Sequence, residues 1–268
     1  DGLAKYPIVP GHEFSGTIVQ IGASAKYQER FKVGEKVVGE CVLSRNDNSP
    51  RQEVGVINYN GAYSKFIVMP GDYVHKIPEG LDLKTACLAE PLAVVLRAIK
   101  RISPRLNSQE KVAVIGAGPI GNLCAQVLTN SGHQVSVFDK NQARLAFLKD
   151  RAEAVNQEIK NLQDFNVIVE ATGQAFVLKQ ILTESKVNAT LLLLGFPYGN
   201  INYNFEDIVG REKVIIGSVG GGPYEFEEAL QLLPKLETAP FLQQVLPLEE
   251  FQKAWRLHHS YLKIILKP

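Results

Sequence analysis

The segment from Lys111 to Asp139 constrains the fold of this chain more than any other. A short apolar run, Val112 to Ile115, has the length and composition of a strand that is buried on both faces. A helical pattern of apolar residues follows and stops at Ser131-Gly132, and a second apolar run comes next and ends at Asp139. The order strand, helix, strand predicts the first unit of a parallel sheet.

Three glycines stand in the turn between the first strand and the helix. Gly116, Gly118 and Gly121 have the spacing G-x-G-x-x-G, which provides a tight turn, room for a pyrophosphate and close packing of helix on strand. The amide groups at the helix start can bind the pyrophosphate, and Asp139 stands where an acid can accept the ribose hydroxyls of an adenosine. Glycines alone also occur in turns for steric reasons, but the complete order favours a dinucleotide site.

Strands and helices continue to alternate after Asp139. This alternation predicts an α/β fold with a doubly wound parallel sheet. The expected strands are 167–171, 189–194 and 214–217, and the expected helices are 141–150, 175–182 and 206–211. The connection 150–166 is short, so a strand within it would be vestigial.

The first 80 residues have a different pattern, with short apolar runs separated by Gly and Pro turns. They predict a smaller β-rich domain. Strands are expected at 17–21, 61–68 and 73–77, and a turn followed by a strand is expected at 31–39. The polar stretch 44–60 is expected to be an exposed loop, and helices are expected at 83–89 and 92–102. The tail predicts a helix from Tyr224, a strand at 245–246, a helix at 249–258 and a last strand at 262–266.

Composition excludes several classes of function. The formal net charge of the 268 residues is +1 and no stretch is strongly basic, so we expect no nucleic-acid partner. No apolar run approaches the ~20 residues of a membrane span, so we expect no membrane insertion. The cysteines Cys41, Cys87 and Cys124 are scattered and odd in number, which favours a reducing cytoplasm over a disulfide framework.

Two short motifs carry side chains that could do chemistry. His12-Glu13 lies where a loop enters a strand, and imidazole and carboxylate are both good zinc ligands, but a capped turn with a hydrogen-bonded histidine is an equally simple interpretation. Glu90 stands before Pro91 at a helix entry, where its side chain is free to bind a metal, although the helix dipole alone also favours an acid there.

Several longer strings resemble, in their order, the zinc-dependent medium-chain alcohol dehydrogenases. They extend from about Tyr6 to Pro268 and read PIVPGHEFSGTIVQIG, VGEKV, GAYSKFIVMPGDYVHKIPEG, LAEPLAV, VAVIGAGPIG, VIVEATG and LKIILKP. Within that family the chain is most similar to the polyol branch of sorbitol and galactitol-phosphate dehydrogenases, which have a glutamate in E-P-L-x-V.

The resemblance implies a Rossmann domain at 96–220 and a GroES-like catalytic domain at 1–95 that the tail 221–268 completes. It implies a catalytic zinc with His12, Glu13 and Glu90 as ligands, and homodimers or tetramers that form through the sheet edge at 214–218. It also implies that NAD contacts Gly116, Gly118, Pro119, Ile120, Gly121, Asp139, Lys140, Arg144, Thr172, Gly173, Gly195, Phe196, Ser218 and Val219.

The chain departs from the family in three places. The family's first zinc ligand is a cysteine before the G-H-E motif, and this chain begins after that point, so its proton relay is missing as well. The lobe that holds a structural zinc is replaced by residues 41–60 with one cysteine, so we expect no structural zinc. Residues 219–222 read VGGG where sorbitol dehydrogenases have an aromatic residue and an arginine, which argues against sorbitol itself.

These departures predict an incomplete metal site. We expect His12 and Glu90 to converge on one cleft between the domains, with weak or absent zinc. None of Cys41, Cys87 and Cys124 is expected to replace the missing thiolate.

The leading hypothesis is therefore a zinc-dependent oxidoreductase. It would transfer hydride between NAD and a secondary alcohol of a polyol, sugar or cyclitol, with or without a phosphate group. A zinc-free reductase of the same superfamily, and a non-catalytic NAD-binding protein or module of a larger polypeptide, are the alternatives.

Overall fold

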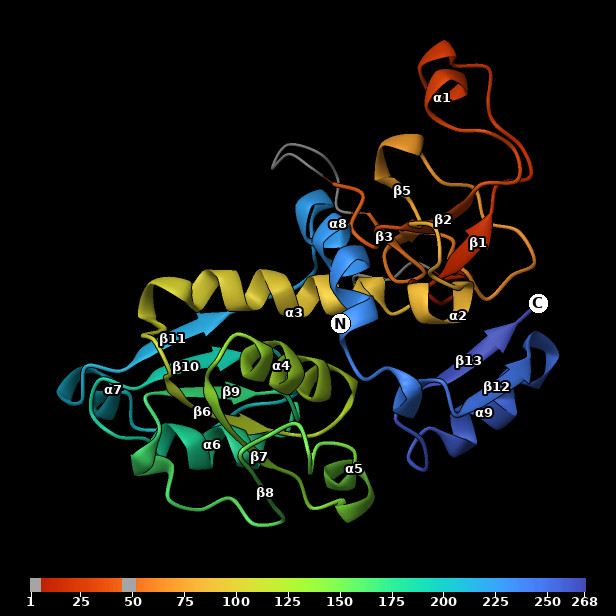
Figure 1. The fold of residues 1–268 in the computed structure, drawn as a ribbon. Coiled ribbons are helices and arrows are strands. Elements are labelled where there is room, and N and C mark those ends of the chain that lie inside the picture. The colour runs from red at the N-terminus through yellow and green to blue at the C-terminus, as the bar shows by residue number, and fades with distance from the viewer. Residues whose placement is uncertain (1–5, 45–51) are drawn as a thin grey trace. The chain divides into compact units, whose positions relative to one another are not determined.

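The computed structural model describes residues 6–44 and 52–268 (Figure 1). The chain divides into two compact units, which are described here one at a time. The first unit contains residues 1–93 and 220–268, and the second contains residues 94–219. The polar residues 45–51 of the expected loop and the first five residues lie outside the described part.

The second unit is built on a parallel sheet of six strands in the order β11-β10-β9-β6-β7-β8. If β6 is counted as the first strand, the order is 6-5-4-1-2-3, which is the Rossmann order. The second and third strands lie on one side of β6 and the last three on its other side. The strands are β6 (Lys111–Ile115), β7 (Gln134–Phe138), β8 (Ala154–Asn156), β9 (Val167–Glu170), β10 (Thr190–Leu193) and β11 (Val214–Gly217). The predicted doubly wound sheet is thereby confirmed, and the vestigial strand is β8 at one edge.

Apolar runs form this sheet because both of its faces are covered. All four residues of β9 are buried, and so are the last four of β6. The core that contains Ile168 and Leu191 also includes Ile181, which lies on a helix of the same unit. The helices are α4 (Pro119–Asn130), α5 (Gln142–Ala146), α6 (Ala175–Glu184) and α7 (Glu206–Gly210), while α3 (Ala89–Ile102) begins in the first unit and ends in the second.

The first unit holds a small antiparallel sheet in the order β1-β2-β5. Two further strand pairs are short and parallel, β3 with β4 and β12 with β13. The strands are β1 (Ser15–Thr17), β2 (Lys36–Gly39), β3 (Glu53–Val54), β4 (Asn58–Tyr59), β5 (Val74–Lys76), β12 (Gln244–Pro247) and β13 (Ile264–Lys267). The helices are α1 (Ala25–Arg30), α2 (Leu83–Ala86), α8 (Pro223–Leu232) and α9 (Phe251–Leu257).

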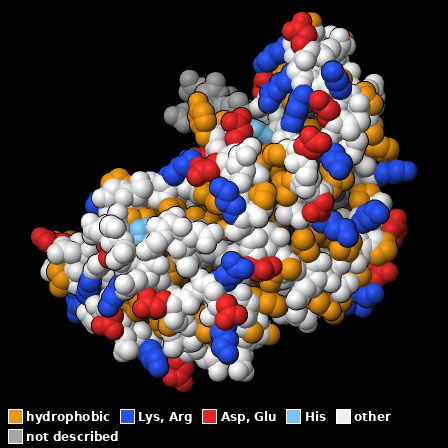
Figure 2. Space-filling view, viewed as in Figure 1, with side chains coloured by type: hydrophobic (Ala, Val, Ile, Leu, Met, Phe, Trp, Pro, Cys, Tyr) orange, Lys and Arg blue, Asp and Glu red, His pale blue; other side chains and the backbone are white. Residues whose placement is uncertain are grey.

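Single 3-10 turns complete the described elements of both units. They span Gly71–Tyr73, Ser103–Arg105, Leu162–Asp164, Leu233–Lys235, Ala239–Phe241 and Leu248–Glu250. Among the described residues, no helix has the length and apolar character that crossing a bilayer requires. On the face drawn in Figure 2, basic and acidic side chains are interspersed.

Two expected strands of the first unit are wrong in extent. The strand expected at 17–21 ends at Thr17, because β2 starts only at Lys36 and the chain turns back near Gly34, whose N–H donates to the Ile18 carbonyl. No strand forms at 61–68. There the N–H groups of residues 61–63 donate to carbonyls of residues 9–11, so this segment braces a loop instead of joining a sheet.

Candidate metal and dinucleotide sites

His12 lies on a loop whose backbone, at Gly11, packs directly against the backbone of Gly55 and Gly61. Gly11 has a φ of +93°, and a Cβ atom added at Gly61 would lie 2.1 Å from the Gly11 carbonyl oxygen. One added at Gly55 would lie 2.4 Å from the same oxygen. The N–H of Ala62 donates to this carbonyl at 2.8 Å. Because only glycine permits such an approach, these three residues fix the course of the chain into His12.

Cys41 lies two residues after the end of β2, and two neighbouring segments hold the backbone there. Its carbonyl accepts from the Val54 N–H at 2.9 Å, and the preceding Glu40 N–H donates to the Tyr73 carbonyl at 2.9 Å. The Cys41 side chain is 8% exposed. The thiol is therefore presented from a rigid strand end.

Glu90 lies in the first turn of α3, one residue after the helix begins. The preceding helix α2 is capped by Asp82, whose Oδ1 accepts from the Lys84 and Thr85 N–H groups at 2.9 and 3.1 Å. Glu90 itself is 6% exposed. Burial raises the pKa of Glu90 to about 8, and the charge of Glu53 acts in the same direction.

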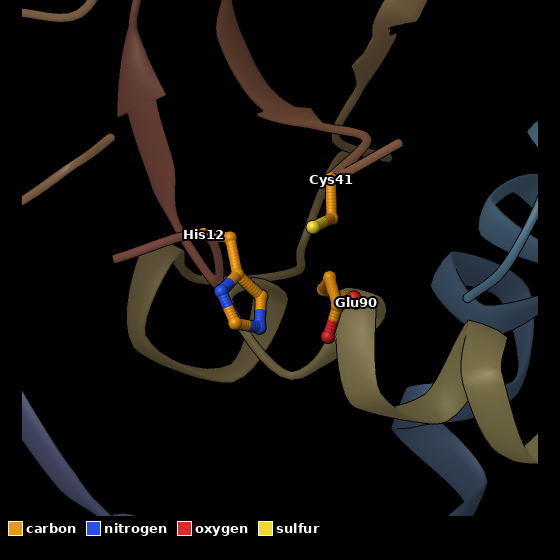
Figure 3. A group of neighbouring side chains, drawn as sticks. All are labelled: His12, Cys41 and Glu90. Carbon is orange, nitrogen blue, oxygen red and sulfur yellow. The ribbon is translucent and has the colours of Figure 1, made fainter. Parts of the chain in front are cut away.

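The side chains of His12, Cys41 and Glu90 point toward one another (Figure 3). One ligand atom from each residue, an imidazole nitrogen, the thiol sulfur and a carboxylate oxygen, lies within 4.8 Å of the other two. Burial first, and then Lys263, lowers the pKa of His12, so the imidazole is held in the neutral form that binds metals. A half-buried imidazole, a buried thiol and a buried carboxylate are a donor set that fits zinc, with a fourth position left for water or substrate.

Glu13 does not belong to this group. Its Oε2 accepts a hydrogen bond from Nζ of Lys263, and the two side chains form an ion pair. Lys263 is mostly buried, and that burial lowers its pKa to about 8. No sequence motif indicates this partner, because Lys263 lies 250 residues further along the chain.

Cys41 is the functional candidate that sequence reasoning missed: none of the three cysteines is expected from the sequence to replace the missing thiolate, and the structure places Cys41 beside His12 and Glu90. Strand register explains the placement. Ser15 of β1 pairs with Val38 of β2 in an antiparallel ladder. Extending this register by three residues on each chain segment puts His12 opposite Cys41. Residues 18–35, which include α1, join β1 to β2, so no turn motif in the sequence assigns this register.

The glycine-rich turn of the second unit has the contacts that its spacing predicts. Gly116 has a φ of +104°, and a Cβ atom there would lie 3.0 Å from the Ala171 backbone. A Cβ atom at Gly121 would lie 1.8 Å from the Gly116 carbonyl oxygen. Gly118 precedes the first residue of α4, Pro119, so the free amide groups at this helix start are at the turn. Ile120 is the second residue of α4.

Asp139 follows the last residue of β7, and its carboxylate faces the glycine-rich turn. Oδ2 accepts from the Ala117 N–H at 2.7 Å, and Oδ1 accepts from the Asn141 N–H at 2.8 Å. Lys140 is the next residue and is exposed. Nε of Arg144 is buried, and within the described residues it has no hydrogen-bond partner. Nη1 of Arg144 lies 3.9 Å from the position of a Cβ atom at Gly118.

The remaining predicted cofactor residues lie at the carboxyl ends of β9, β10 and β11. Buried Glu170 accepts from the Thr172 and Gly173 N–H groups at 2.7 and 3.1 Å. A Cβ atom at Gly195 would lie 2.2 Å from the Gly173 nitrogen, so these two turns pack backbone to backbone. Ligands of open parallel sheets bind at this edge. The residues that follow these turns and strands differ in exposure: Phe196 is 61% exposed, Val219 is 51% exposed and Ser218 is buried.

Two family models match the chain. Residues 83–267 match the family described as glucose dehydrogenase C-terminus, and residues 2–79 match the alcohol dehydrogenase GroES-like domain. The chain belongs to the zinc-dependent medium-chain alcohol dehydrogenases. It is an NAD(P)-dependent alcohol dehydrogenase, and the expected α/β fold with a GroES-like part is confirmed. The alternative of a non-catalytic protein is thereby set aside.

Curated relatives and a solved structure agree with this medium-chain alcohol dehydrogenase assignment. Sorbitol dehydrogenase from Halalkalibacterium halodurans is 29% identical over 98% of this chain and 84% of its own length. L-threonine 3-dehydrogenase from Aliivibrio fischeri is 27% identical over 97% of this chain and 82% of its own length. A protein from Escherichia coli CFT073 that is described as a short chain alcohol dehydrogenase, solved with the cofactor NADH, has the same fold, with a TM-score of 0.85 and 25% identity, and the match covers 100% of this chain and 86% of that one.

Proposed function

We propose that this dehydrogenase transfers hydride between NAD and a secondary alcohol of a polyol, sugar or cyclitol, with or without a phosphate group. The observation that carries the proposal is the buried carboxylate of Glu90 beside His12. A carboxylate keeps the metal site rich in oxygen donors, which suits a substrate with neighbouring hydroxyl groups. The name of the relative from Halalkalibacterium halodurans, sorbitol dehydrogenase, supports the same substrate class.

The second unit would bind the cofactor. The amide groups at the start of α4 would hold the pyrophosphate, and Asp139 would accept the hydroxyls of the adenosine ribose. Thr172, Gly173, Gly195, Phe196, Ser218 and Val219 would contact the rest of the cofactor, with Lys140 and Arg144 along the adenosine. Bound NAD supplies the hydride acceptor, and the protein has to orient it.

The first unit would bind the substrate hydroxyl through a catalytic metal. His12 and Glu90 would hold the ion, and Glu13, the third ligand predicted from the sequence, would instead remain with Lys263 as a positioning pair beside His12. A bound zinc ion acts as a Lewis acid toward an alcohol oxygen and lowers the pKa of the hydroxyl. Burial of Glu90 and Cys41 keeps bulk water away from these side chains.

A substrate panel tests the proposed reaction. Reduction of NAD would be followed with polyols, sugars and cyclitols, each with and without a phosphate group, and with ethanol, a long-chain alcohol and L-threonine. We expect turnover with at least one polyhydroxy compound. Activity on ethanol or L-threonine with none on the polyhydroxy compounds would contradict the substrate class.

A pair of acid-to-amide variants tests the role of Glu90. Glu90→Gln would lower kcat/KM by more than about a hundredfold. Changing a residue that only hydrogen-bonds to a metal ligand typically lowers activity or metal affinity about 10–100-fold, and loss of a ligand itself should cost at least as much. Glu79→Gln, at an exposed acid of the same unit, is the matched control and would leave the rate unchanged. Full activity of Glu90→Gln would remove the proposed metal role.

Titration with NADH and NADPH tests the cofactor preference. The charge of Asp139 would repel a 2′-phosphate, so NADH should bind more tightly than NADPH when followed by fluorescence. Asp139→Asn should reduce this preference by about tenfold, because hydrogen bonds to charged groups contribute ~1.5–3 kcal/mol. Asp150→Asn, at an exposed acid of the same unit, should leave it unchanged. Tighter binding of NADPH to the unaltered protein would overturn the preference.

We also propose that the protein forms homodimers, or tetramers built from them, through β11, and that it works in a reducing cytoplasm. Strand β11 is the last strand of the six-stranded sheet, and Ile215 on it is 38% exposed. An edge strand of this kind can pair with a second copy of itself. The three cysteines are buried and form no disulfide, which suits a compartment that keeps thiols reduced.

A further inference from the structure

We infer that Cys41 supplies a thiolate ligand of the catalytic metal. This inference rests on the proposed function, since it concerns the same metal. It makes the site a cysteine, histidine and glutamate set, and all three ligands come from residues 12–90 of this chain.

The spacing of the three side chains supports the inference. With Zn–S of about 2.3 Å and Zn–N or Zn–O of about 2.0–2.1 Å, tetrahedral ligand atoms lie about 3.3–3.6 Å apart. Here the sulfur, the nitrogen and the oxygen lie within 4.8 Å of one another. Closing this gap needs shifts of about 1 Å, which side-chain rotation provides without moving the strand or helix.

The backbone around Cys41 is built to hold the sulfur in place. The neighbouring Glu40 is 1% exposed, and its Oε1 lies 2.8 Å from Nε2 of His75 on β5. The His75 ring also stacks on Phe226 of α8, with ring centroids 5.4 Å apart. The residue before the proposed ligand is thus fixed by a buried polar pair and by aromatic packing. Rigid support of this kind is what metal ligands require.

The other two cysteines have no comparable setting. Burial raises the pKa of both Cys87 and Cys124 to about 12, so each remains a thiol. Sγ of Cys87 donates to the Lys84 carbonyl at 3.0 Å, and Cys124 is fully buried in α4. Within the described residues, only Cys41 joins a histidine and an acid at metal-binding distance. Metal binding by Cys41 releases the thiol proton to solvent as the sulfur–metal bond forms.

Cobalt substitution tests the inference without measuring activity. The metal-free protein would be titrated with Co²⁺, and the near-ultraviolet charge-transfer band of a thiolate–cobalt bond would be recorded. The unaltered protein, Cys87→Ser and Cys124→Ser should all give the band. Cys41→Ser should lose the charge-transfer band and bind Co²⁺ more than about a hundredfold more weakly. This loss exceeds the about 10–100-fold loss of affinity on changing a residue that only hydrogen-bonds to a metal ligand. Binding of NADH to every variant would show that the fold is intact.

X-ray absorption on the unaltered protein loaded with Zn²⁺ covers the case in which Cys41→Ser does not fold. One sulfur at about 2.3 Å would support the inference. No sulfur in the zinc shell, or a charge-transfer band that survives in Cys41→Ser, would overturn it, although His12 and Glu90 could still hold a catalytic metal. No binding of either metal would overturn both the inference and the metal half of the proposed function. Intact NADH binding would then still support the cofactor half.

Discussion

Glu13 and Glu90 are acids in motifs of the same family, but their partners differ. Glu13 forms an ion pair with Lys263, and both side chains are largely shielded from solvent. Glu90 is buried beside an imidazole and a thiol, and its pKa is raised by that burial. The lysine partner suits Glu13 to positioning the His12 loop, and the imidazole and thiol beside Glu90 suit that acid to binding a metal cation.

A double-mutant cycle measures the Glu13–Lys263 pair. Glu13→Gln and Lys263→Met should each lower the free energy of unfolding, because each leaves its partner shielded and unpaired. The coupling energy should be about 1–3 kcal/mol, within the range for contacting residues and below the full cost of breaking a completely buried pair. Urea unfolding of the two single variants and the double variant gives this number.

The exposed pair Glu250–Lys253 is the control for that cycle. Its atoms lie 2.6 Å apart, but the side chains are 42% and 57% exposed. Exposed helical pairs contribute only about 0.2–0.5 kcal/mol. A coupling energy for Glu13 and Lys263 no larger than that of the control would contradict a shielded pair.

Two short elements present the proposed ligands from unit 1, and each depends on local contacts. The loop before His12 depends on the approach of Gly55 and Gly61 to the Gly11 carbonyl. The helix that carries Glu90 follows α2, which begins at the cap formed by Asp82. Changes at these supporting residues should therefore affect stability and metal binding without touching a ligand.

Gly61→Ala tests the loop. The added methyl group would meet the Gly11 carbonyl oxygen at 2.1 Å, so the backbone must shift, with an expected loss of about 1–3 kcal/mol of unfolding free energy. Co²⁺ affinity should fall as well, because His12 moves with Gly11. Gly22→Ala is the matched control, since nothing lies within 4 Å of an added Cβ atom there. Equal stability and metal affinity of the two variants would argue against glycine packing as the support of His12.

Asp82 tests the cap of α2. Asp82→Ala should lower the unfolding free energy by about 1 kcal/mol at pH 7, whereas Asp82→Asn keeps an acceptor oxygen and should cost less. The Thr85 hydroxyl, together with the N–H groups at the helix start, holds the pKa of Asp82 below its ordinary value of 3.8. Because folding lowers this pKa, the charged cap stabilises the fold above pH 3.8.

That contribution is lost as the pH falls through the folded-state pKa. The stability advantage of the unaltered protein over Asp82→Asn should therefore be constant from pH 7 to about pH 5 and should decline below pH 3.8, as measured by thermal unfolding. An advantage that grows on acidification would contradict the direction of the pKa shift.

At the scale of the whole molecule, β11 is an edge strand of the six-stranded sheet, and a second copy of the chain could pair with it. Val214 and Ser218 donate their N–H groups to carbonyls of the β10 side, from Ala189 and Leu193. Since N–H groups alternate along a strand, the N–H of Ile215 points away from β10 and toward the free edge. That group is available to a second copy.

Ile215→Pro tests assembly through this edge. Proline removes the outward N–H without removing a bond to β10, so the variant should be monomeric in light scattering while the unaltered protein is at least dimeric. Ile215→Thr keeps the N–H and should remain associated. A monomeric unaltered protein at micromolar concentration, or an associated Ile215→Pro, would contradict an interface at β11. NADH binding to each variant checks the fold.

The Rossmann unit could be predicted from the sequence because its signals lie close together in the chain. Buried apolar runs, the spacing of Gly116, Gly118 and Gly121, and the acid at Asp139 all fall within 30 residues. The small sheet of the first unit was less predictable. Residues 61–68 have the composition of a strand, but their N–H groups bond to the loop before His12.

The sequence by itself determined the alternation of strands and helices, the glycine-rich turn, and His12 and Glu90 as candidate ligands. Only the tertiary structure decided what stands beside them. Cys41 and His12, each three residues beyond the Ser15–Val38 pair of the β1–β2 ladder, lie beside each other, and Lys263 reaches Glu13 from the far end of the chain. Residue type and spacing report on contacts within one element. A ligand set is assembled by strand pairing and packing between distant segments, and that information is not written at any single position.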